Sequence, residues 1–498
     1  MLGRGKLEGK VVLTADSTLM SDYRRNEFLG FGTCAPSNFL PDFLYRRLFF
    51  PPIGTEGGLP ASAPYGLRKI EAQLVKEGFN VVTVTPEHLG SYVCSAKVLG
   101  VHVMDPFGLG PASSTLAFLL KKEPFLAQYF RQLFELPEVR RAKKRGMKII
   151  VGGPGVWQLN YRPNFVQKCG IDCVIEGEAE KVVGKVFRAA MNGEPLPANY
   201  EVSIEESPRV EEIPDIINAS VNGLVEIGRG CCRGCRFCSV TLRPLRWFPL
   251  EKILGEVEVN LKAGNTGVIL HEDDVMLYGS KTTLPDDEKL LGLHEAVARK
   301  CDGITWSHCS LAAVAAKPQL FAKVAEIIRQ KQPWWGVEIG LETGSSELAT
   351  KIMPAKAHPF KPEQWPEVAC TGMGLMHDNM LVPACTLIVG SPEETEDDVV
   401  KTMELLDDVK DCRSLIVPLF FVPMGRLKDE GWFKDTKMTR AHEELMIKCL
   451  EHDFRWVDDL IKISFSEGWK SHVIGPFFRL FAAIAKYKVK QAGIKARI

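Results

Sequence analysis

Three cysteines stand close enough together along the chain to hold an iron–sulfur centre. Cys231, Cys235 and Cys238 follow a Cys-x3-Cys-x2-Cys spacing within the glycine- and arginine-rich run 227–239. Soft thiolate ligands select iron–sulfur clusters and zinc. Three such ligands would hold three irons of a [4Fe–4S] cluster and leave the fourth iron open. The spacing therefore predicts a centre at which a small molecule can bind to the metal.

Zinc and disulfides are the alternatives to a cluster, and both fit the sequence less well. A structural zinc site is closed by four ligands, usually from two Cys-x2-Cys pairs. Cys232 is a fourth thiol nearby, but it directly follows Cys231 and cannot easily reach the same metal. A disulfide framework is typical of small secreted chains, whereas this chain has 498 residues and we expect no signal peptide. We expect the more distant Cys169 and Cys173 to be core residues.

Composition narrows the functional class. The chain holds 62 Lys and Arg against 62 Asp and Glu, a formal net charge of +0, so we expect no nucleic-acid partner. No apolar run is long enough for a membrane-spanning helix. An apolar stretch at 476–487 leads into a basic end, and we expect it to pack on its own domain rather than on a membrane. The predicted location is the cytoplasm.

The first part of the chain, about residues 1–210, is predicted to be a Rossmann-like α/β domain. Short apolar strands alternate with amphipathic helical segments, which is typical of a parallel sheet covered on both faces. The strands are expected at 10–14, 80–85, 98–104, 147–151 and 173–175, and the helices at 64–78, 115–120, 124–136 and 180–191.

Polar and glycine-rich loops follow the carboxyl ends of these strands. Ligands of open α/β sheets bind at those ends, where glycine lets the backbone approach a large flat cofactor. The candidate cofactor-binding residues in these loops are Asp16, Ser17, Thr18, Asp105, Gly108, Gly152, Gly153, Gly177 and Glu178. A long aromatic insertion at 26–64 follows the first strand. We expect it to cover the cofactor or substrate, with a small satellite hydrophobic cluster as the alternative.

The middle part, about residues 211–425, is predicted to be a partial (β/α)6 barrel. Polar residues gather just past each apolar strand, where barrel enzymes place their sites. The strands are expected at 224–228, 267–271, 303–307, 336–339, 381–389 and 415–422. The last part, 426–498, is predicted to be mostly helical, with helices at 439–461 and 476–487.

The cysteine motif, the order of strands and two later segments resemble those of cobalamin-dependent radical S-adenosylmethionine (SAM) enzymes, the class B radical SAM methyltransferases. Residues 340–345 resemble the Gly-x-Glu-x-Gly segment of that family, and residues 390–395 resemble its Gly-x-Pro-Glu-Glu-Thr segment. The resemblance implies that SAM binds the open iron through its amino and carboxylate groups. The residues that it implies for cofactor binding in the barrel are Phe237, Glu272, Ser307, Gly340, Glu342 and Gly390.

The same resemblance implies that the first domain binds cobalamin. A Gly-Gly-Pro-His turn is common in the family after the fourth strand, and Gly155 stands here in place of the histidine. The Asp-x-His-x-x-Gly signature of histidine-ligated cobalamin proteins is also missing from the sequence. The absence of this signature agrees with a family that generally binds cobalamin without its histidine, and the lower axial position of the corrinoid is left unassigned.

The implied reaction is C-methylation of an unactivated sp3 carbon. A SAM-derived radical would remove a hydrogen atom, and methylcobalamin, remethylated by a second SAM, would supply the methyl group. The architecture also resembles enzymes that methylate the α carbon of a glutamine in methyl-coenzyme M reductase, which implies a protein or peptide substrate. A lipid or another small molecule is the alternative. An external electron donor is implied, and no catalytic residue is assigned.

Two other functions remain open at the level of the sequence. An enzyme with the same cofactors could catalyse a rearrangement or cyclisation without methyl transfer, which the product mass would distinguish. A non-enzymatic cluster or corrinoid sensor would not need the SAM-binding segments, so those segments count against it.

Overall fold

The computed structural model describes residues 10–35, 40–464, 476 and 479 of the chain. The chain divides into two compact units, Met1–Val225 with Phe248–Val268, and Glu226–Trp247 with Ile269–Ile498. The predicted domain boundaries near residues 210 and 425 stay predictions. The helix predicted at 476–487 falls almost entirely outside the described residues.

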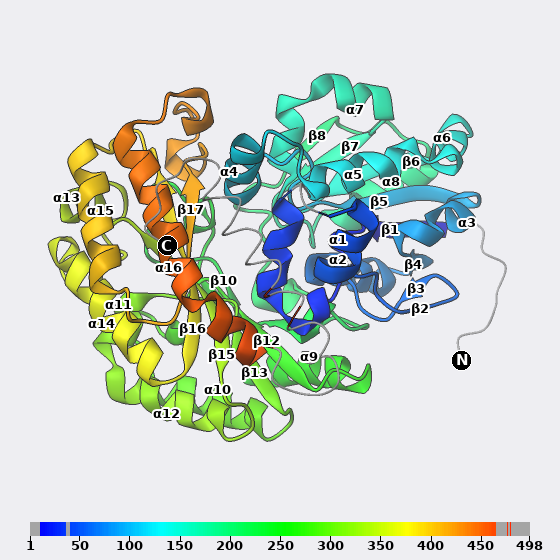
Figure 1. Cartoon of the computed structure of the whole chain (residues 1–498). Coiled ribbons are helices and arrows are strands. Elements are labelled where there is room, and N and C mark those ends of the chain that lie inside the picture. The colour runs from blue at the N-terminus through cyan, green and yellow to red at the C-terminus, as the bar shows by residue number, and fades with distance from the viewer. Residues whose placement is uncertain (1–9, 36–39, 465–475, 477–478, 480–498) are drawn as a thin grey trace. The chain divides into compact units, whose positions relative to one another are not determined.

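The first unit is built on a sheet of six strands in the order β4-β1-β5-β6-β7-β8 (Figure 1). Every neighbouring pair in this sheet is parallel. The strands of the unit are β1 (Lys10–Ala15), β2 (Thr55–Glu56), β3 (Leu59–Pro60), β4 (Val81–Thr83), β5 (Ala96–His102), β6 (Lys148–Gly152), β7 (Cys173–Glu176) and β8 (Asn199–Glu201). All five predicted strands are present, and β8 escaped prediction because it is short and polar.

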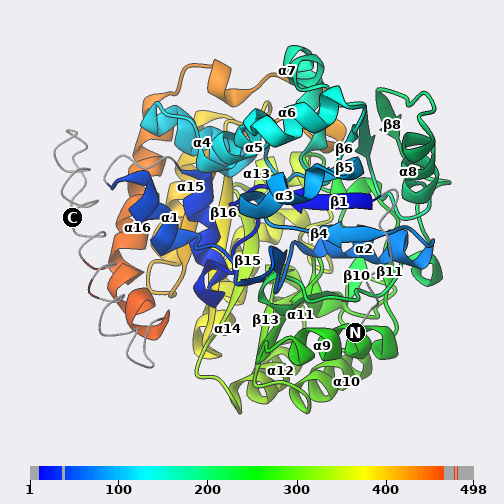
Figure 2. The same ribbon diagram turned by 90° about the vertical axis from the view of Figure 1, so that its right-hand side faces the viewer.

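Helices cover both faces of this sheet, as Figure 2 shows for α2 on one side and α5 and α6 on the other. Successive residues of a strand point to opposite faces. Val11 and Leu13 of β1 pack with α2 and α8, whereas Val12 packs with α3, α5 and α6. The helices of the unit are α1 (Asp42–Phe49), α2 (Tyr65–Lys76), α3 (Leu89–Val93), α4 (Pro111–Leu120), α5 (Phe125–Glu135), α6 (Pro137–Lys144), α7 (Pro163–Cys169), α8 (Val183–Asn192) and α9 (Leu250–Lys262). The predicted Rossmann-like α/β fold is confirmed.

The strand order of this sheet reverses between β1 and β5, because β4 lies beyond β1 while the later strands continue from β5. Ligands of open α/β sheets bind outside the carboxyl ends of the strands at such a point. Residues 16–18 follow β1 and residues 103–110 follow β5. Two of the predicted cofactor-binding segments therefore lie where the topology favours a ligand.

The insertion at 26–64 carries an aromatic cluster that packs on α5. Tyr45 and Phe49 of α1 stack with ring centroids 4.3 Å apart. Tyr45 and Phe50 contact Phe125 of α5, with ring centroids 5.0 and 5.3 Å apart. This is the hydrophobic cluster that the sequence left as an alternative, and a role of the insertion as a cover over a ligand stays a prediction.

A buried ion pair attaches α9 to α2 within the first unit. Lys69 of α2 pairs with Glu256 of α9, and both side chains are only 1% exposed. Glu256 also accepts hydrogen bonds from the hydroxyl of Tyr65 at 2.5 Å and from the backbone of Ile216 at 3.1 Å. Lys69 donates a second bond to the carbonyl of Pro214. Such partners are needed because an unpaired buried charge is strongly destabilising.

The second unit contains two sheets that continue each other, β13-β12-β9 and β14-β15-β16-β17, although β9 and β12 each begin with residues of the first unit. Only Ser307 separates β13 from β14; its N–H donates to Leu270 of β12, and its carbonyl accepts from Glu338 of β15. The strands are β9 (Leu224–Glu226), β10 (Gly228–Arg229), β11 (Arg246–Trp247), β12 (Gly267–His271), β13 (Gly303–Trp306), β14 (His308–Cys309), β15 (Trp335–Glu342), β16 (Leu381–Val389) and β17 (Leu415–Phe420). The sheet order follows the chain order, and the predicted partial barrel is confirmed.

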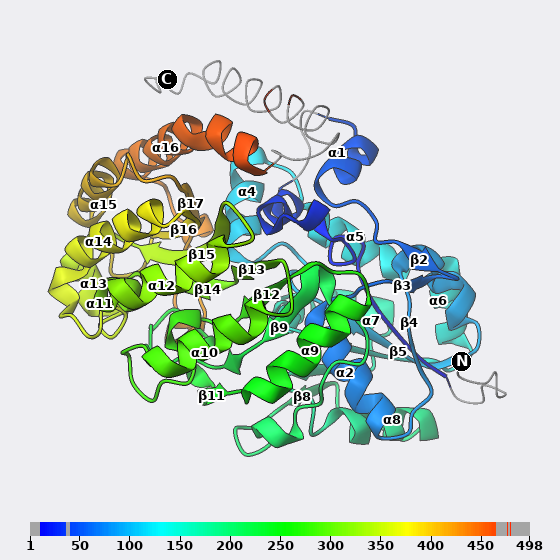
Figure 3. The ribbon, with the colours of Figure 1, turned by 90° about the horizontal axis from the view of Figure 1, so that it is seen from below.

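Helices of the second unit lie on the outer side of these strands (Figure 3). They are α10 (Asp287–Ala298), α11 (Leu311–Ala316), α12 (Pro318–Arg329), α13 (Ser346–Ile352), α14 (Trp365–Asp378), α15 (Glu396–Asp408) and α16 (Arg440–Ser464). Asp453 of α16 accepts a bond from the backbone of Ile416 at 2.7 Å, which holds α16 on β17. The described part of the predicted helical region thus holds one long helix, which follows two short 3-10 helices, Gly425–Leu427 and Phe433–Asp435. No described helix has the length and hydropathy needed to cross a bilayer.

Replacing Lys69 with Met should destabilise the first unit by about 3–5 kcal/mol, because the Glu256 carboxylate would stay buried without its cation. Urea unfolding followed by tryptophan fluorescence measures the change. Lys76→Met, at an exposed position of the same helix, is the control and should unfold like the unchanged protein. Equal unfolding midpoints for the two variants would show that the buried pair does not stabilise the unit.

Candidate functional site

The three cysteines of the motif lie in the loop that follows β9 and β10. Cys235 is buried, Cys231 and Cys238 are partly exposed, and Cys232 is exposed. The N–H of Cys238 donates to the carbonyl of Cys235 at 3.3 Å, and the hydroxyl of Thr241 donates to the carbonyl of Cys238 at 2.9 Å. The loop is therefore a short hydrogen-bonded turn in which Cys232 differs in exposure from the three predicted ligands.

Among the described residues, no group of three or more His, Cys, Asp or Glu side chains is arranged around a single metal position. A [4Fe–4S] cluster takes one thiolate on each iron, so its ligands need not converge on one point. The role of the three cysteines as cluster ligands is compatible with their placement and stays a prediction.

Lys356 is a cation beside this loop. Iron binds the thiolate form, so each thiol must lose its proton when a cluster assembles. Burial raises the pKa of Cys235 to about 11 and also raises the pKa values of Cys231 and Cys238. The charge of Lys356 acts in the opposite direction on the pKa values of Cys235 and Cys238. Its ammonium nitrogen also lies 6.0 Å from the ring centre of Phe237.

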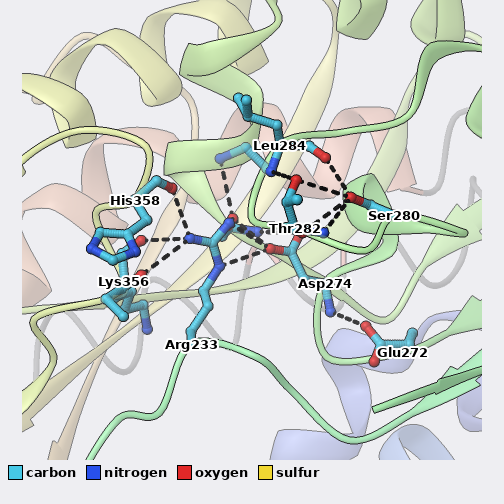
Figure 4. A network of polar contacts seen from close by, with 11 residues as sticks. Arg233, Glu272, Asp274, Ser280, Thr282, Leu284, Lys356 and His358 are labelled. Atoms are coloured by element: carbon cyan, nitrogen blue, oxygen red, sulfur yellow. Dashed lines mark hydrogen bonds and ion pairs between the residues drawn. The ribbon is translucent and has the colours of Figure 1, made fainter.

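Arg233, inside the cysteine motif, attaches the loop to three other segments (Figure 4). Its Nε and Nη2 atoms lie 3.0 and 2.9 Å from Oδ2 of Asp274, just past β12. Nη1 donates to the carbonyls of Lys356 and His358 at 2.9 and 3.0 Å. Nη2 donates to the hydroxyl of Ser310 at 2.6 Å. The side chains of Arg233 and Asp274 are 3% and 4% exposed, so this planar fork of donors holds the loop by buried, charge-assisted bonds.

The acidic end of β12 presents Glu272 as a buried side chain with an unused oxygen. One carboxylate oxygen accepts from the backbone of Asp274, while Oε1 is buried with no hydrogen-bond partner in the described part of the chain. Burial, with a contribution from Asp273, raises the pKa of Glu272 well above its usual range. Ser307 hydrogen-bonds to the backbone of Glu272 in both directions, at 3.1 and 3.0 Å. A cationic donor would satisfy the unused oxygen and favour the ionised form.

Glu342 ends β15 and pairs with Lys356. Oε1 of Glu342 lies 2.5 Å from Nζ of Lys356, and both side chains are mostly buried. Glu342 has a φ of 63°, a left-handed conformation that non-glycine residues adopt mainly at functional sites. Gly340 leaves room for the pair, because a Cβ there would lie 2.0 Å from Oε1 and 2.2 Å from Nζ. Two of the predicted SAM-binding residues thus share one arrangement with Lys356.

The turn that follows β16 contacts both the loop that carries the cysteine motif and helix α16. Arg236 of the cysteine motif pairs with Glu393. Oε2 of Glu394 accepts from the backbone of Gly390 at 2.7 Å and lies 2.9 Å from Nε2 of His442 in α16. The predicted contact of Gly390 with SAM stays a prediction. The turn that contains Gly390 is held in place by Arg236 of the cysteine motif and by His442 of α16.

Several buried polar atoms at these strand ends have no hydrogen-bond partner among the described residues. They are Oε1 of Glu272, Oγ of Ser391, Nδ1 of His271 and Nδ1 of His308. Buried polar atoms are rarely left unpaired in native proteins. The ends of β12, β14 and β16 therefore retain hydrogen-bonding capacity for a polar ligand, which fits the predicted SAM-binding segments.

In the first unit, the predicted residues after β1 bond mainly within their own loop. Oδ1 of Asp16 accepts from the backbone of Thr18 at 2.8 Å and also from its hydroxyl. Ser17 donates to Glu87 at 3.1 Å. Burial raises the pKa of Asp16 to about 6. The turn accounts for these residue types without a ligand, so their contact with a cofactor stays a prediction.

Asp105 closes the loop after β5 in the same way. Its Oδ1 accepts from the backbone of Gly110 at 3.0 Å and from the amide of Gln158 at 2.6 Å. A Cβ on Gly153, where φ is 117°, would lie 2.4 Å from the carbonyl of Val103, so only glycine fits there. The remaining predicted residues are the last residue of β6, Gly152, and three residues in the loops that follow β5 and β7, Gly108, Gly177 and Glu178. Their contact with a cofactor also stays a prediction.

Sequence reasoning did not single out Arg233, Arg236 and Lys356. A signal existed for the two arginines, because both stand inside the cysteine motif and a buried loop of thiolates needs cations. Lys356 had no such signal, since only the fold brings it to Glu342 and to the cluster loop.

Comparison with a family model identifies the class of the middle part of the chain. Residues 225–406 match the family model of the Radical SAM superfamily. This stretch includes the cysteine motif and the strands that carry Glu272, Glu342 and Gly390. The chain therefore contains a radical SAM domain, and such a domain implies a [4Fe–4S] cluster and SAM as cofactors.

More specific similarities are partial. The tRNA-2-methylthio-N(6)-dimethylallyladenosine synthase of Thermotoga petrophila is 27% identical over 270 residues, which cover 53% of this chain and 57% of that protein. The synthase of the same name from Fusobacterium nucleatum is 25% identical over 302 residues, covering 58% and 63% of the two chains. The chain thus spans less than two thirds of the length of these relatives.

One solved structure extends the similarity beyond the barrel. The radical SAM methyltransferase TsrM from Kitasatospora setae matches with a TM-score of 0.54 and 16% identity, over 84% of this chain and 77% of that chain. At this level of identity the match shows that the folds are alike, including the α/β unit that precedes the barrel.

Replacing Cys231, Cys235 or Cys238 with Ala should each abolish the iron–sulfur absorbance of the anaerobically reconstituted protein, because each removes the only protein ligand of one iron. Cys232→Ala is the matched control and should keep the absorbance. Loss of the cluster in Cys232→Ala together with its retention in Cys231→Ala would show that the ligand register is wrong.

Arg233→Lys should leave the three cluster ligands in place but weaken SAM binding by roughly tenfold or more, because a lysine cannot keep the forked contacts to Asp274 and the two carbonyls. The change in the electron paramagnetic resonance spectrum of the reduced cluster on SAM addition measures this binding. Arg299→Lys, at an exposed arginine of the same unit, is the control. Equal SAM affinity in Arg233→Lys and the unchanged protein would contradict the role given to Arg233.

Proposed function

We propose that the chain is a cobalamin-dependent radical SAM C-methyltransferase. The observation that carries the proposal is a three-cysteine motif within a radical SAM domain, since three ligands leave one iron of a [4Fe–4S] cluster open to SAM. When bound, the cluster and SAM supply hydrogen-atom abstraction from an unactivated sp3 carbon, and cobalamin supplies the methyl group.

The residues of the radical SAM domain bind and orient these cofactors. Cys231, Cys235 and Cys238 would hold the cluster. Glu272 offers an unpaired oxygen to the SAM amine, and ionisation of its carboxyl on binding would strengthen that bond. Glu342 would receive a second polar group of SAM, in exchange for or beside its bond to Lys356.

Cobalamin is assigned to the first unit, at the carboxyl edge of the sheet where the strand order reverses. Two observations support this assignment. The loops after β1 and β5 lie at that point of the topology. The TsrM structure, which matches over both parts of this chain, was solved with cobalamin and a [4Fe–4S] cluster bound.

The finer part of the proposal concerns the substrate. We propose a protein or peptide substrate, with the α carbon of a glutamine in methyl-coenzyme M reductase as the specific candidate, and a lipid or small molecule as the competitor. Support comes from the resemblance in architecture. The electron donor is external, and the reaction is proposed to take place in the cytoplasm.

A second candidate is methylthio transfer to a tRNA nucleoside, because the two relatives above carry that activity in their names. The balance of 62 basic and 62 acidic residues counts against it, since tRNA binding normally needs an excess of positive charge. Product mass separates the two, because methylthio transfer adds sulfur and methylation does not. A rearrangement without methyl transfer would give a product that carries the mass of neither a methyl nor a methylthio group.

The proposal predicts uptake of cobalamin and transfer of substrate hydrogen to SAM's adenosyl group. The full-length protein is reconstituted anaerobically with iron, sulfide and hydroxocobalamin, and bound corrinoid is measured by its absorbance after gel filtration. With a substrate deuterated at the target carbon, deuterium should appear in 5′-deoxyadenosine as methylated product forms. A protein that never takes up cobalamin, or methylation without deuterium transfer, would contradict the proposal.

A further inference from the structure

The strands of the radical SAM domain carry polar side chains where a barrel interior usually carries aliphatic ones. Trp335, Val337 and Ile339 of β15 are buried, and Trp335 packs on Phe321 of α12 with ring centroids 5.9 Å apart. Because successive side chains of a strand point to opposite faces, Glu338 faces away from the helices. Barrel interiors are usually filled by Val, Ile and Leu. A glutamate at this position therefore indicates a polar site inside the barrel.

Glu338 shares this face with His308. The two residues are register partners on the parallel strands β14 and β15, and Nε2 of His308 lies 3.1 Å from Oε2 of Glu338. Their side chains are 41% and 40% exposed, although β15 has a neighbouring strand on each side. This pair is therefore open to solvent or to a ligand and is not part of a packed core.

His271, at the end of β12, lies beside this pair, with its ring centroid 6.2 Å from that of His308. Nδ1 of each histidine is buried without a hydrogen-bond partner in the described part of the chain. Buried polar atoms of this kind are normally satisfied by water or by a ligand. The two nitrogens and the remaining lone pairs of Glu338 together offer both donor and acceptor positions.

The charges around this site are matched in pairs. The pairs are Glu226 with Arg229 at 2.8 Å, Glu342 with Lys356 at 2.5 Å, and Glu338 with His308 at 3.1 Å. Burial lowers the pKa of His308, but the hydrogen bond and the charge of Glu338 outweigh it and raise the pKa overall. The charge of Asp273 also acts to raise the pKa values of the two histidines, and Asp273 belongs to the acidic segment assigned to the SAM amine. An added charge would have to compete with one of these pairs, whereas a neutral polar group would not.

We infer that His308, Glu338 and His271 form a binding subsite for an uncharged, hydrogen-bonding group of the substrate, of which a carboxamide is the type. A carboxamide donates to the Glu338 carboxylate and accepts from an imidazole N–H, so it uses both kinds of position. A carboxylate ligand would meet the like charge of Glu338, and an ammonium ligand would compete with the proton of His308. The inference rests on the proposed function, because it defines the substrate chemistry of the same domain.

Binding of three small probes of similar size tests the subsite without turnover. The full-length protein with its oxidised cluster, labelled with 15N in the histidine rings, is titrated with propionamide, propionate and propylammonium. No SAM, cobalamin or reductant is present. The His308 signals are identified by their loss in His308→Gln. Propionamide should shift them saturably, with an affinity at least roughly tenfold above that for either charged probe. Signals of His88 in the first unit should not move.

The Glu338→Gln variant tests the basis of the selectivity. Removal of the carboxylate charge should let propionate bind about as well as propionamide, while Glu363→Gln, at an exposed glutamate of the same domain, should keep the original preference. Tighter binding of propionate or propylammonium than of propionamide in the unchanged protein, or no shift of His308 with any probe, would overturn the inference. Because the test needs no catalysis, such a result leaves the proposed function standing. Conversely, failure to methylate any substrate would not remove a subsite that binds propionamide.

Discussion

The rest of the site depends on the buried ion pair between the guanidinium of Arg233 and the carboxylate of Asp274. Arg233 stands between two predicted cluster ligands, and its charge is stable in the interior only while Asp274 and several oxygen acceptors surround it. Those acceptors come from the end of β12, the start of α11 and the segment after α13. Satisfying one buried charge therefore holds three segments that are far apart in sequence against the cysteine loop.

Other charged side chains of the radical SAM domain are also paired with a group of opposite charge. Lys356, whose carbonyl accepts from Arg233, uses its side chain to pair with Glu342 and to favour thiolates in the cysteine loop. Deeper in the strands, His308 and Glu338 form another matched pair. The atoms left without partners, on Glu272, Ser391 and the two histidines, lie at neighbouring strand ends. The domain thus combines paired charges with unused hydrogen-bonding positions. Unpaired buried polar atoms do not stabilise a fold, but they can orient a polar ligand.

Periodicity located the strands well because burial on both faces leaves a continuous apolar signal; the predicted bounds of β12 and β16 are those of the structure. Short or polar elements such as β8 gave no such signal. The cysteine spacing predicted an iron–sulfur centre because three thiols in one loop have few other uses. Lys356 and the His308–Glu338 pair depend on contacts between segments far apart in sequence, which no local pattern encodes. Asp16 and Asp105 each accept a backbone hydrogen bond within their own loop, which explains an aspartate at both positions.

The proposed function depends on SAM binding to an open fourth iron, and electron–nuclear double resonance on the reduced cluster detects that bond. The unchanged protein is reconstituted, reduced and frozen with SAM that carries 15N in its amino group. We expect a 15N hyperfine coupling strong enough to require direct bonding of that nitrogen to iron, and its loss when S-adenosylhomocysteine lacking the label is substituted. A cluster that shows no nitrogen coupling at saturating SAM would mean that the fourth iron is closed, and the radical mechanism proposed here would be contradicted.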